Sequence, residues 1–315
     1  MPVPPLDPDV RARIDALGPV PSMRSRGIEQ VRAGVEAMQP PAETLPMAEV
    51  ENLTIPGPYG PIPLRVYRPT TESAAPAVVH LHGGGLAMGS NASFEPLARQ
   101  IATATGATVI GVDYRLAPEW GAPVQLEESY AATAWVAANA GRLRIDPGRV
   151  VVLGDSAGGG LAAGAALLAR DRGGPRIFGQ VLLYPGLDRD MGAASIVTMP
   201  DAPMLLREDI VFMHELVDSA STGPQDCYRV PAYAEDLSGL PPAIVVTAEG
   251  DPIRDWGERY AGRLRDARVQ TTVTRYPGVL HGFLMRPENS ARATLAIAEI
   301  GALLRARFAH PLPFG

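Results

Sequence analysis

The fold is decided by the stretch Val150-Val-Val-Leu-Gly154-Asp155-Ser156-Ala157-Gly158-Gly159-Gly160-Leu161, which continues as Ala-Ala-Gly-Ala-Ala-Leu-Leu-Ala to residue 169. A short apolar run leads into a glycine-rich turn, and a segment rich in alanine and leucine follows. This order predicts a buried strand, a sharp turn and a helix, with a Gly-x-Ser-x-Gly motif on the turn. Such a turn lifts the serine hydroxyl above the sheet, so Ser156 is a candidate nucleophile. The alternative interpretation is a serine that caps a closely packed helix.

Similar apolar runs recur along the chain, and most of them are separated by stretches with helical spacing. They cover residues 77–81, 108–112, 180–184, 243–247 and 270–274. Continuous Val, Ile and Leu runs that alternate with helices are typical of a mainly parallel sheet with helices on both faces. Two earlier runs, residues 50–55 and 62–67, predict a hairpin. The expected fold class is therefore α/β.

The segment from residue 188 to 240 breaks this rhythm, because it is rich in methionine and leucine and has no run typical of a strand. We expect it to lie over the carboxyl edge of the sheet and to pack with the N-terminal helices as a lid. The first of those helices is predicted over residues 10–17, with Asp7 or Asp9 as its cap. The expected division is N-terminal cap helices at 1–45, core at 46–187, cap insertion at 188–240 and core again at 241–315.

Charge and cysteine content exclude several classes of protein. The 315 residues carry a formal net charge of −6, which argues against nucleic acid or an anionic membrane as a partner. A single cysteine, Cys227, rules out an internal disulfide and a thiolate metal site, and we expect no metal or other cofactor. The first residues do not resemble a secretory signal, and no apolar run is long enough to span a bilayer. The sequence therefore predicts a cytoplasmic protein.

A second motif follows the run at 77–81 and reads His80-Leu-His82-Gly83-Gly84-Gly85. Acyl transfer needs backbone N–H groups directed at the oxygen that becomes negative, and glycines let the backbone approach it closely. The alternatives are an ordinary glycine-rich turn and a phosphate-binding loop, but no Gly-Lys-Ser or Gly-Lys-Thr follows, as a phosphate-binding loop would require. Together with the serine motif, this loop indicates a hydrolase.

The base that a serine nucleophile needs is found by elimination among five histidines. His80 lies in a strand, His82 opens the glycine loop, His214 lies in the expected lid and His310 in the C-terminal tail. The remaining one, His281, follows the last strand and precedes the final helix. Its position after serine and acid in the chain is the usual order for a hydrolase of this architecture.

The carboxylate that orients this histidine is expected after the strand at 243–247. Asp251 is the choice, because it lies in the loop directly before a proline, and Glu249 is the alternative. Asp251 is also suited to cap the helix that begins near Ile253.

The chain resembles the hormone-sensitive-lipase family of bacterial carboxylesterases, in the branch with a GDSAG motif. The resemblance covers about residue 50 to the C-terminus. It is carried by six motifs: His82–Gly85, Asp113–Glu119, Gly154–Gly158, Tyr184-Pro185, Asp251–Asp255 and His281–Phe283. Trp256 departs from the family pattern, which commonly has an acidic residue at that position, and so does the segment Trp120-Gly-Ala122.

The resemblance implies an α/β-hydrolase fold with a helical cap and a triad of Ser156, Asp251 and His281. It further implies that the N–H groups of Gly83, Gly84 and Ala157 form the oxyanion hole, and that Arg115 pairs with Glu119. The implied substrates are small acyl esters with short to medium chains. An amidase or acyltransferase with the same triad, or a ligand-binding receptor on this fold, remains an alternative. Relatives often form homodimers through the last strand and last helix, which suggests residues 270–274 and 290–308 as an interface.

Overall fold

One sheet with the strand order β1-β2-β4-β3-β5-β6-β7-β8 runs through the structure, a computed structural model that describes residues 4–38 and 45–311. The strands are β1 (Glu49–Ile55), β2 (Ile62–Arg68), β3 (Ala75–Leu81), β4 (Thr108–Val112), β5 (Ile145–Asp155), β6 (Gly179–Leu183), β7 (Ala243–Gly250) and β8 (Thr271–Leu280). β1 and β2 form the predicted hairpin, and β2 is antiparallel to β4. All pairs from β4 across to β8 are parallel, so the mainly parallel sheet predicted from the sequence is confirmed.

Helices connect the strands and cover the sheet. They are α1 (Pro8–Leu17), α2 (Met23–Arg26), α3 (Ile28–Glu36), α4 (Glu95–Thr105), α5 (Val124–Ala138), α6 (Ala140–Leu143), α7 (Ala157–Asp171), α8 (Ala194–Thr198), α9 (Arg207–Ser219), α10 (Arg254–Asp266) and α11 (Ala291–Ala309). Two short 3-10 helices lie at Pro231–Tyr233 and Pro287–Asn289.

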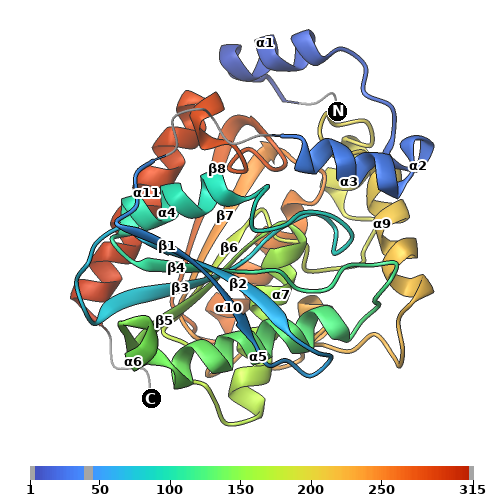
Figure 1. The fold of residues 1–315 in the computed structure, drawn as a ribbon. Helices are drawn as coiled ribbons and strands as arrows, with labels where there is room; N and C mark the ends of the chain where they lie inside the picture. Colours follow the sequence, from blue (N-terminus) through green and yellow to red (C-terminus); the bar gives the residue numbers. More distant parts are fainter. Residues whose placement is uncertain (1–3, 39–44, 312–315) are drawn as a thin grey trace.

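The two faces of the sheet pack against different helices, as the alternation of side chains along β5 shows. Val150 and Val152 belong to a core cluster with apolar residues of α5, α7 and α10. Val151 and Leu153 point the other way, into a cluster with residues of α4 and α11. Successive strand residues face opposite sides, so an unbroken apolar run is buried on both. Figure 1 shows α4 and α11 on one side of the strands and α5 on the other.

The chain changes its direction of travel across the sheet at β3. From β3 it crosses to β4 on one side, returns to β5 on the other side of β3, and then proceeds to β8. Ligands of open α/β sheets bind in the crevice at such a switch point, beyond the carboxyl ends of the strands. The loops that begin at His82 and Ser156 leave β3 and β5 at this edge.

A helical layer lies over the same edge. The segment between β6 and β7 contains α8, α9 and the 3-10 helix Pro231–Tyr233, and α2 packs against α9. The backbone N–H of Met23 donates to Asp209 Oδ1 over 2.6 Å, and Arg24 Nη2 lies 2.7 Å from Glu215 Oε2. The N-terminal helices and the long insertion therefore contact each other directly (Figure 1).

The first helix, in contrast, is tied to the core. Asp7 occupies the N-cap position of α1, but its side chain does not form the capping hydrogen bond expected from the sequence. The carboxylate of Asp7 instead lies 2.9 Å from Arg292 Nε, and Asp9 Oδ2 accepts the N–H of Ala291 over 2.9 Å. Both acidic residues thus hold α1 against the beginning of α11.

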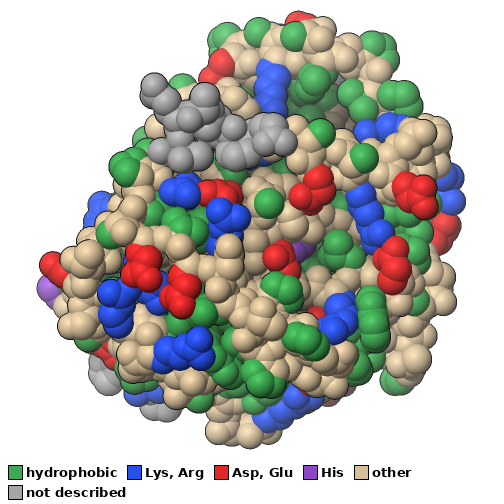
Figure 2. Space-filling model, in the orientation of Figure 1, with side chains coloured by type: hydrophobic (Ala, Val, Ile, Leu, Met, Phe, Trp, Pro, Cys, Tyr) green, Lys and Arg blue, Asp and Glu red, His purple; other side chains and the backbone are tan. Residues whose placement is uncertain are grey.

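The surface carries charges of both signs. On the face shown in Figure 2, acidic and basic side chains are interspersed and neither sign forms one continuous patch. Within the described residues, no helix has both the length and the apolar character required to cross a membrane.

Candidate active site

Ser156 lies on a strained turn between β5 and α7. Its backbone has φ +54° and ψ −123°, a conformation that non-glycine residues rarely adopt. The flanking glycines are needed because any side chain would clash there. A Cβ on Gly154 would overlap the carbonyl oxygen of Gly158, and a Cβ on Gly158 would overlap the carbonyl oxygen of Leu81. The side chain of Ser156 makes no capping hydrogen bond to α7. The alternative interpretation of this serine as a simple helix cap is therefore wrong.

The hydroxyl of Ser156 faces a histidine. His281 Nε2 lies 2.8 Å from Ser156 Oγ, and His281 Nδ1 lies 2.8 Å from Asp251 Oδ2. Asp251 is fully buried, while 9% of the surface of His281 remains exposed. With the proton on Nδ1, the imidazole donates to the carboxylate and its Nε2 is free to accept the serine proton.

Three strand ends bring these residues together. Ser156 follows β5, Asp251 follows β7 and His281 follows β8, all at the carboxyl edge of the sheet. Asp251 has two functions in this arrangement, because its Oδ1 also accepts the N–H of Ile253 over 2.9 Å. One oxygen of the carboxylate thus binds His281 and the other binds the N–H of Ile253. Ile253 itself occupies the N-cap position of α10, which has no side-chain capping hydrogen bond, so the alternative interpretation of Asp251 as the helix cap is wrong.

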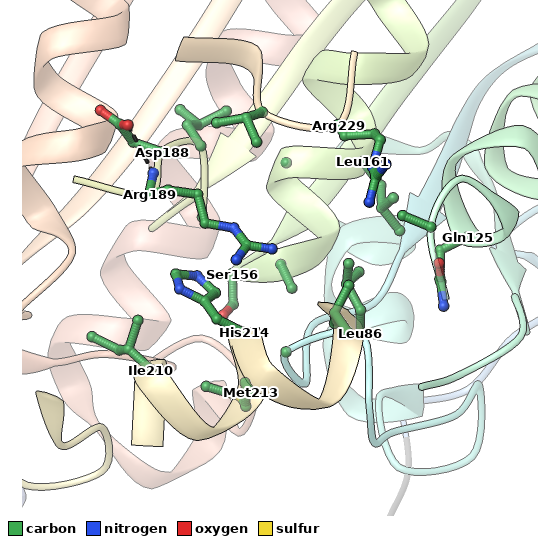
Figure 3. Close-up of a pocket in the computed structure, with 18 of the residues that line it drawn as sticks. Leu86, Gln125, Ser156, Leu161, Asp188, Arg189, Ile210, Met213, His214 and Arg229 are labelled. Carbon is green, nitrogen blue, oxygen red and sulfur yellow. Dashed lines mark hydrogen bonds between the residues drawn. The ribbon is translucent and has the colours of Figure 1, made fainter. Parts of the chain in front are cut away.

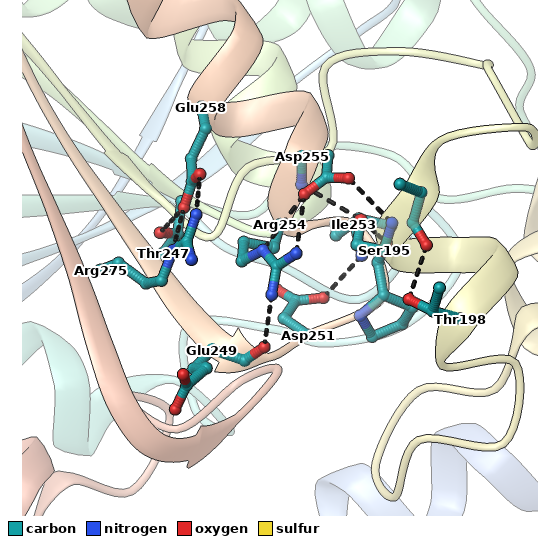
Figure 4. Close-up of polar contacts among 12 residues, drawn as sticks. Ser195, Thr198, Thr247, Glu249, Asp251, Ile253, Arg254, Asp255, Glu258 and Arg275 are labelled. Carbon is teal, nitrogen blue, oxygen red and sulfur yellow. Dashed lines mark hydrogen bonds and ion pairs between the residues drawn. The ribbon is translucent and has the colours of Figure 1, made fainter. Parts of the chain in front are cut away.

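The loop that carries Asp251 is fixed from the insertion side. Asp255 Oδ2 accepts the N–H of Ser195 over 2.8 Å, and Ser195 Oγ donates to the carbonyl oxygen of Pro252 over 2.6 Å (Figure 4). The alternative acid, Glu249, contributes its backbone carbonyl to Arg254, and Figure 4 shows its carboxylate directed away from Asp251. The insertion thus supports the position of the buried carboxylate.

The glycine loop after β3 differs from the expectation at one residue. The N–H of Gly83 donates to Asp155 Oδ1 over 3.0 Å, so it is not free to bind a developing oxyanion. The assignment of Gly83 to the oxyanion hole is therefore wrong. Among the described residues, the N–H groups of Gly84, Gly85 and Ala157 have no hydrogen-bond acceptor, and Gly85 and Ala157 line the same cavity as Ser156.

A buried polar group holds this loop in place. His82 stacks between Phe94 and Tyr114, with ring centroids 5.4 and 4.4 Å away, and Tyr114 donates to the His82 carbonyl over 2.5 Å. Burial lowers the pKa of His82 to about 4, so the ring is neutral at pH 7. His80 Nε2 lies 3.2 Å from Asp155 Oδ1, the atom that also binds Gly83. No pattern in the sequence indicated that Asp155 would organise this loop.

Arg115 and Glu119, which the family resemblance pairs with each other, each form an ion pair with another residue. Arg115 pairs with Glu128 on α5, a residue without exposed surface, and its guanidinium lies 4.9 Å from the ring centroid of Trp120. Glu119 pairs with Arg32 on α3 at 2.7 Å. The expected Arg115–Glu119 pair is therefore wrong. Both residues instead fasten the loop after β4, one to the core and one to an N-terminal helix.

A cavity of about 120 Å³ opens in front of Ser156. Its walls come from the glycine loop, the start of α7, the helix α9 and the segment before β7 (Figure 3). Apolar side chains that include Leu86, Leu161, Ile210 and Met213 form most of the lining. Trp256, noted in the sequence as a departure from the family, is buried and lines the cavity, with its Nε1 donating to the carbonyl oxygen of Asp190 over 3.0 Å.

Polar side chains of the same cavity were not identified from the sequence. Arg189, Arg229 and Gln125 line it, and so does His214, which the sequence placed only in the lid. Burial and the charge of Arg189 lower the pKa of His214 to about 4. These residues lie outside the sequence motifs. They come together only because the insertion folds over the sheet, so the sequence alone did not identify them as lining the cavity. In the described part of the chain, no group of three or more His, Cys, Asp or Glu side chains is arranged to hold a metal ion.

Comparison with known proteins places this geometry in a family. The sequence model of the alpha/beta hydrolase fold matches residues 78–285. The chain is 39% identical to the carboxylesterase NlhH of Mycobacterium tuberculosis over 303 residues, which cover 94% of this chain and 93% of the relative. It is 33% identical to an arylesterase of Saccharolobus solfataricus, with 96% of this chain and 98% of the relative covered.

Solved structures agree with the sequence relatives. An esterase of Pyrobaculum calidifontis superposes with a TM-score of 0.86 at 37% identity, over 96% of this chain and 99% of that one. The ester hydrolase EH1AB1 from the metagenome of Lake Arreo, complexed with a derivative of bipyridine phosphonate, superposes with a TM-score of 0.91 at 33% identity, over 96% of this chain and 99% of that one. The chain therefore belongs to the alpha/beta hydrolase family, in the hormone-sensitive-lipase-like group of carboxylesterases.

Proposed function

We propose that the chain is a serine carboxylesterase with Ser156 as nucleophile, His281 as general base and Asp251 as the residue that orients the base. The observation that carries this proposal is the position of His281, whose two ring nitrogens lie 2.8 Å from Ser156 Oγ and 2.8 Å from Asp251 Oδ2. Both distances suit proton transfer between a nucleophile, a base and an orienting carboxylate.

In the first half of the reaction, Ser156 Oγ attacks the ester carbonyl while His281 Nε2 takes the hydroxyl proton. The tetrahedral intermediate collapses as His281 returns this proton to the alcohol oxygen, so that the C–O bond breaks and the acyl-enzyme remains. In the second half, His281 deprotonates a water molecule that attacks the acyl carbonyl. The carboxylic acid leaves and the serine is regenerated.

The negative charge of each intermediate is stabilised by backbone N–H groups. Gly84, Gly85 and Ala157 are the proposed donors, because their N–H groups have no acceptor among the described residues. Ala157 is also the first residue of α7, where the helix dipole favours negative charge. One such donor typically contributes about 3–4 kcal/mol of transition-state stabilisation.

The cavity supports short to medium acyl esters as substrates. A space of about 120 Å³ lined mainly by aliphatic side chains takes several groups the size of a water molecule, each of which needs roughly 10–15 Å³ on the same measure. We propose that residues 188–240 and the N-terminal helices α2 and α3 form the cap that closes this space. The part of the proposed N-terminal cap at residues 39–44 lies outside the described residues. The homodimer and the cytoplasmic location stay predictions from the sequence.

The test is the hydrolysis of p-nitrophenyl esters from acetate to decanoate by the wild type and by Ser156→Ala. The triad predicts a loss of kcat on the order of 10⁶-fold in the variant. Ser219→Ala is the matched control, because Ser219 lies on the exposed side of α9 and its hydroxyl only binds the carbonyl of Leu216.

The same assay separates the alternatives. An amidase turns over the matching p-nitroanilides as well as the esters, and an acyltransferase gives a new ester when an alcohol is added. A folded wild type that turns over no ester contradicts the proposal and favours a binding protein.

A further inference from the structure

The cavity in front of Ser156 contains more positive charge than the hydrolysis of a neutral ester requires. Two guanidinium groups line it, Arg189 from the loop after β6 and Arg229 from the segment before β7. Figure 3 shows both of them directed into the space that also faces Ser156 and His214. The chain as a whole has a net charge of −6, so this local excess is not a consequence of overall composition.

The charge of Arg189 is compensated within the protein. Its two terminal nitrogens each lie 2.8 Å from an oxygen of Asp218 on α9, which is a bidentate ion pair. Asp188, the carboxylate in the cavity lining, is 3.2 Å from Arg259 outside it. His214 is neutral at pH 7 because its pKa is lowered to about 4.

Arg229 forms no such ion pair. Its Nη1 donates to the carbonyl oxygens of Thr222, Gly223 and Pro224 over 3.1, 3.2 and 2.7 Å. Among the described residues no carboxylate lies within the 4.0 Å of a salt bridge to its guanidinium. Asp226 accepts the backbone N–H of Arg229, and the charges of Asp226 and Asp218 act on the guanidinium only from a greater distance. The Nε and Nη2 groups have no acceptor in the same part of the chain. Arg229 is half-buried, and a guanidinium at the wall of a mainly apolar cavity with donors that no protein group accepts can bind an anion there.

We infer that the site takes esters that carry a carboxylate, with Arg229 as the counter-ion of that carboxylate. The inference rests on the proposed esterase function and specifies its substrate class. The scissile bond and the products follow the same scheme: the acyl C–O bond breaks, water supplies the new hydroxyl, and the remote carboxylate is unchanged. A monoester of a dicarboxylic acid carries the charge on the acyl side, and the acetyl ester of a hydroxy acid carries it on the alcohol side.

Two pairs of substrates distinguish a carboxylate on the acyl side of the ester from one on the alcohol side. Monoethyl adipate is compared with ethyl pentanoate for the acyl side, and 4-acetoxybutyrate with butyl acetate for the alcohol side, by titration of released acid at pH 7.5. We expect the anionic ester to have the higher kcat/KM in one of the two pairs. The preference should decline when the salt concentration is raised from roughly 0.1 to 1 M, because the Debye length falls from roughly 10 to 3 Å.

Variants of Arg229 test the residue itself. Arg229→Gln should lower kcat/KM for the preferred anionic ester about 10- to 100-fold, which corresponds to the loss of a charge-assisted hydrogen bond. The loss should be in KM with kcat nearly unchanged, and Arg229→Lys should recover part of it. Neutral esters should change less than about threefold. Arg176→Gln is the matched control, because this substitution removes the same unit of positive charge. Arg176 is exposed and lies in the loop before β6.

The inference fails if Arg229→Gln slows anionic and neutral esters equally, because Arg229 then only fixes residues 222–224. It also fails if the wild type prefers the neutral ester in both pairs. This second test uses only the wild type, so it does not depend on whether the variants fold. Turnover of neutral esters that depends on Ser156, without any preference for anionic ones, overturns this inference alone. Absence of turnover of all four esters overturns the proposed esterase function as well.

Discussion

Replacing Asp251 with asparagine removes the carboxylate that orients His281 while preserving the loop that holds it. An asparagine oxygen in the place of Oδ1 still accepts the N–H of Ile253, which is 2.9 Å away. An asparagine amide in the place of Oδ2, 2.8 Å from His281 Nδ1, donates a hydrogen bond where the carboxylate accepted one. The ring proton is then held on Nε2, and His281 cannot accept the proton of Ser156.

The size of the effect follows from this tautomer change. Loss of the productive tautomer in a serine, histidine and aspartate arrangement costs about 10⁴-fold in kcat, or about 5.5 kcal/mol in activation free energy. The expected effect on folding is smaller. The hydrogen bond to a charged group at this fully buried position contributes about 1.5–3 kcal/mol, and the hydrogen bond to Ile253 stays in place. Asp251→Ala removes the hydrogen bond to Ile253 as well and should be less stable by about a further 1 kcal/mol.

The assay is kcat on p-nitrophenyl butyrate together with urea unfolding of the wild type, Asp251→Asn and Asp251→Ala. Both variants should lose activity to a similar extent, whereas their free energies of unfolding should differ from each other by the hydrogen bond to Ile253. A kcat of Asp251→Asn within tenfold of the wild type would refute the role given to Asp251. Equal stability of the two variants would refute the contribution of the hydrogen bond to Ile253.

Three further predictions follow from other parts of the site. Asp155→Ala leaves the N–H of Gly83 buried without its acceptor and should lower the free energy of unfolding by about 1–3 kcal/mol. Asp155→Ala should also reduce kcat, since the loop with the oxyanion donors loses its support. Urea unfolding measures the change in stability and steady-state kinetics the change in kcat; an unchanged kcat would show that Asp155 does not support the loop. The pKa of His82 is about 4 in the folded chain and near 6.5 when unfolded, so the unfolded chain binds more protons between these values. Stability should therefore rise by about 3 kcal/mol from pH 4 to pH 6.5, and less steeply in His82→Gln, as measured by unfolding at several pH values. Gly158→Ala should cost about 3 kcal/mol of stability, because its Cβ meets backbone carbonyl oxygens at the end of β3, while Gly262→Ala, with no atom within 4 Å, should not destabilise the chain.

The sheet and the positions of the three site residues could be read from the sequence because both depend on local patterns. Apolar runs that are buried on both faces identify the parallel strands, and the carboxyl end of each strand marks where a functional loop begins. Ser156, Asp251 and His281 each follow such a run. The position of His281, 2.8 Å from both Ser156 and Asp251, is then a consequence of strand order.

The oxyanion loop could not be assigned to the residue, because three consecutive glycines carry no side chains that distinguish them. The choice is made by Asp155, whose carboxylate binds the N–H of Gly83 and leaves Gly84 and Gly85 free. A similar reason applies to Arg115. Its partner Glu128 is thirteen residues away on α5, and the nearer Glu119 is drawn to α3, so proximity in sequence did not indicate the pairing.

The polar lining of the cavity was the least predictable feature. Arg189, His214 and Arg229 come from a segment without motifs, and they converge only because α9 and the loops around it fold back over the sheet. Charged residues in such a segment are most often solvated, so composition alone does not reveal which of them faces the nucleophile.

Covalent labelling of the Ser156 hydroxyl tests whether this residue is the nucleophile. The wild type and Ser156→Ala are each incubated with a p-nitrophenyl alkylphosphonate, and the site of modification is determined by mass spectrometry of the intact chains and of their peptides. We expect one phosphonyl group per wild-type chain, attached to Ser156 and formed in step with loss of esterase activity, and none on Ser156→Ala. Labelling of another residue, or full activity in a chain phosphonylated at Ser156, would contradict this role of Ser156.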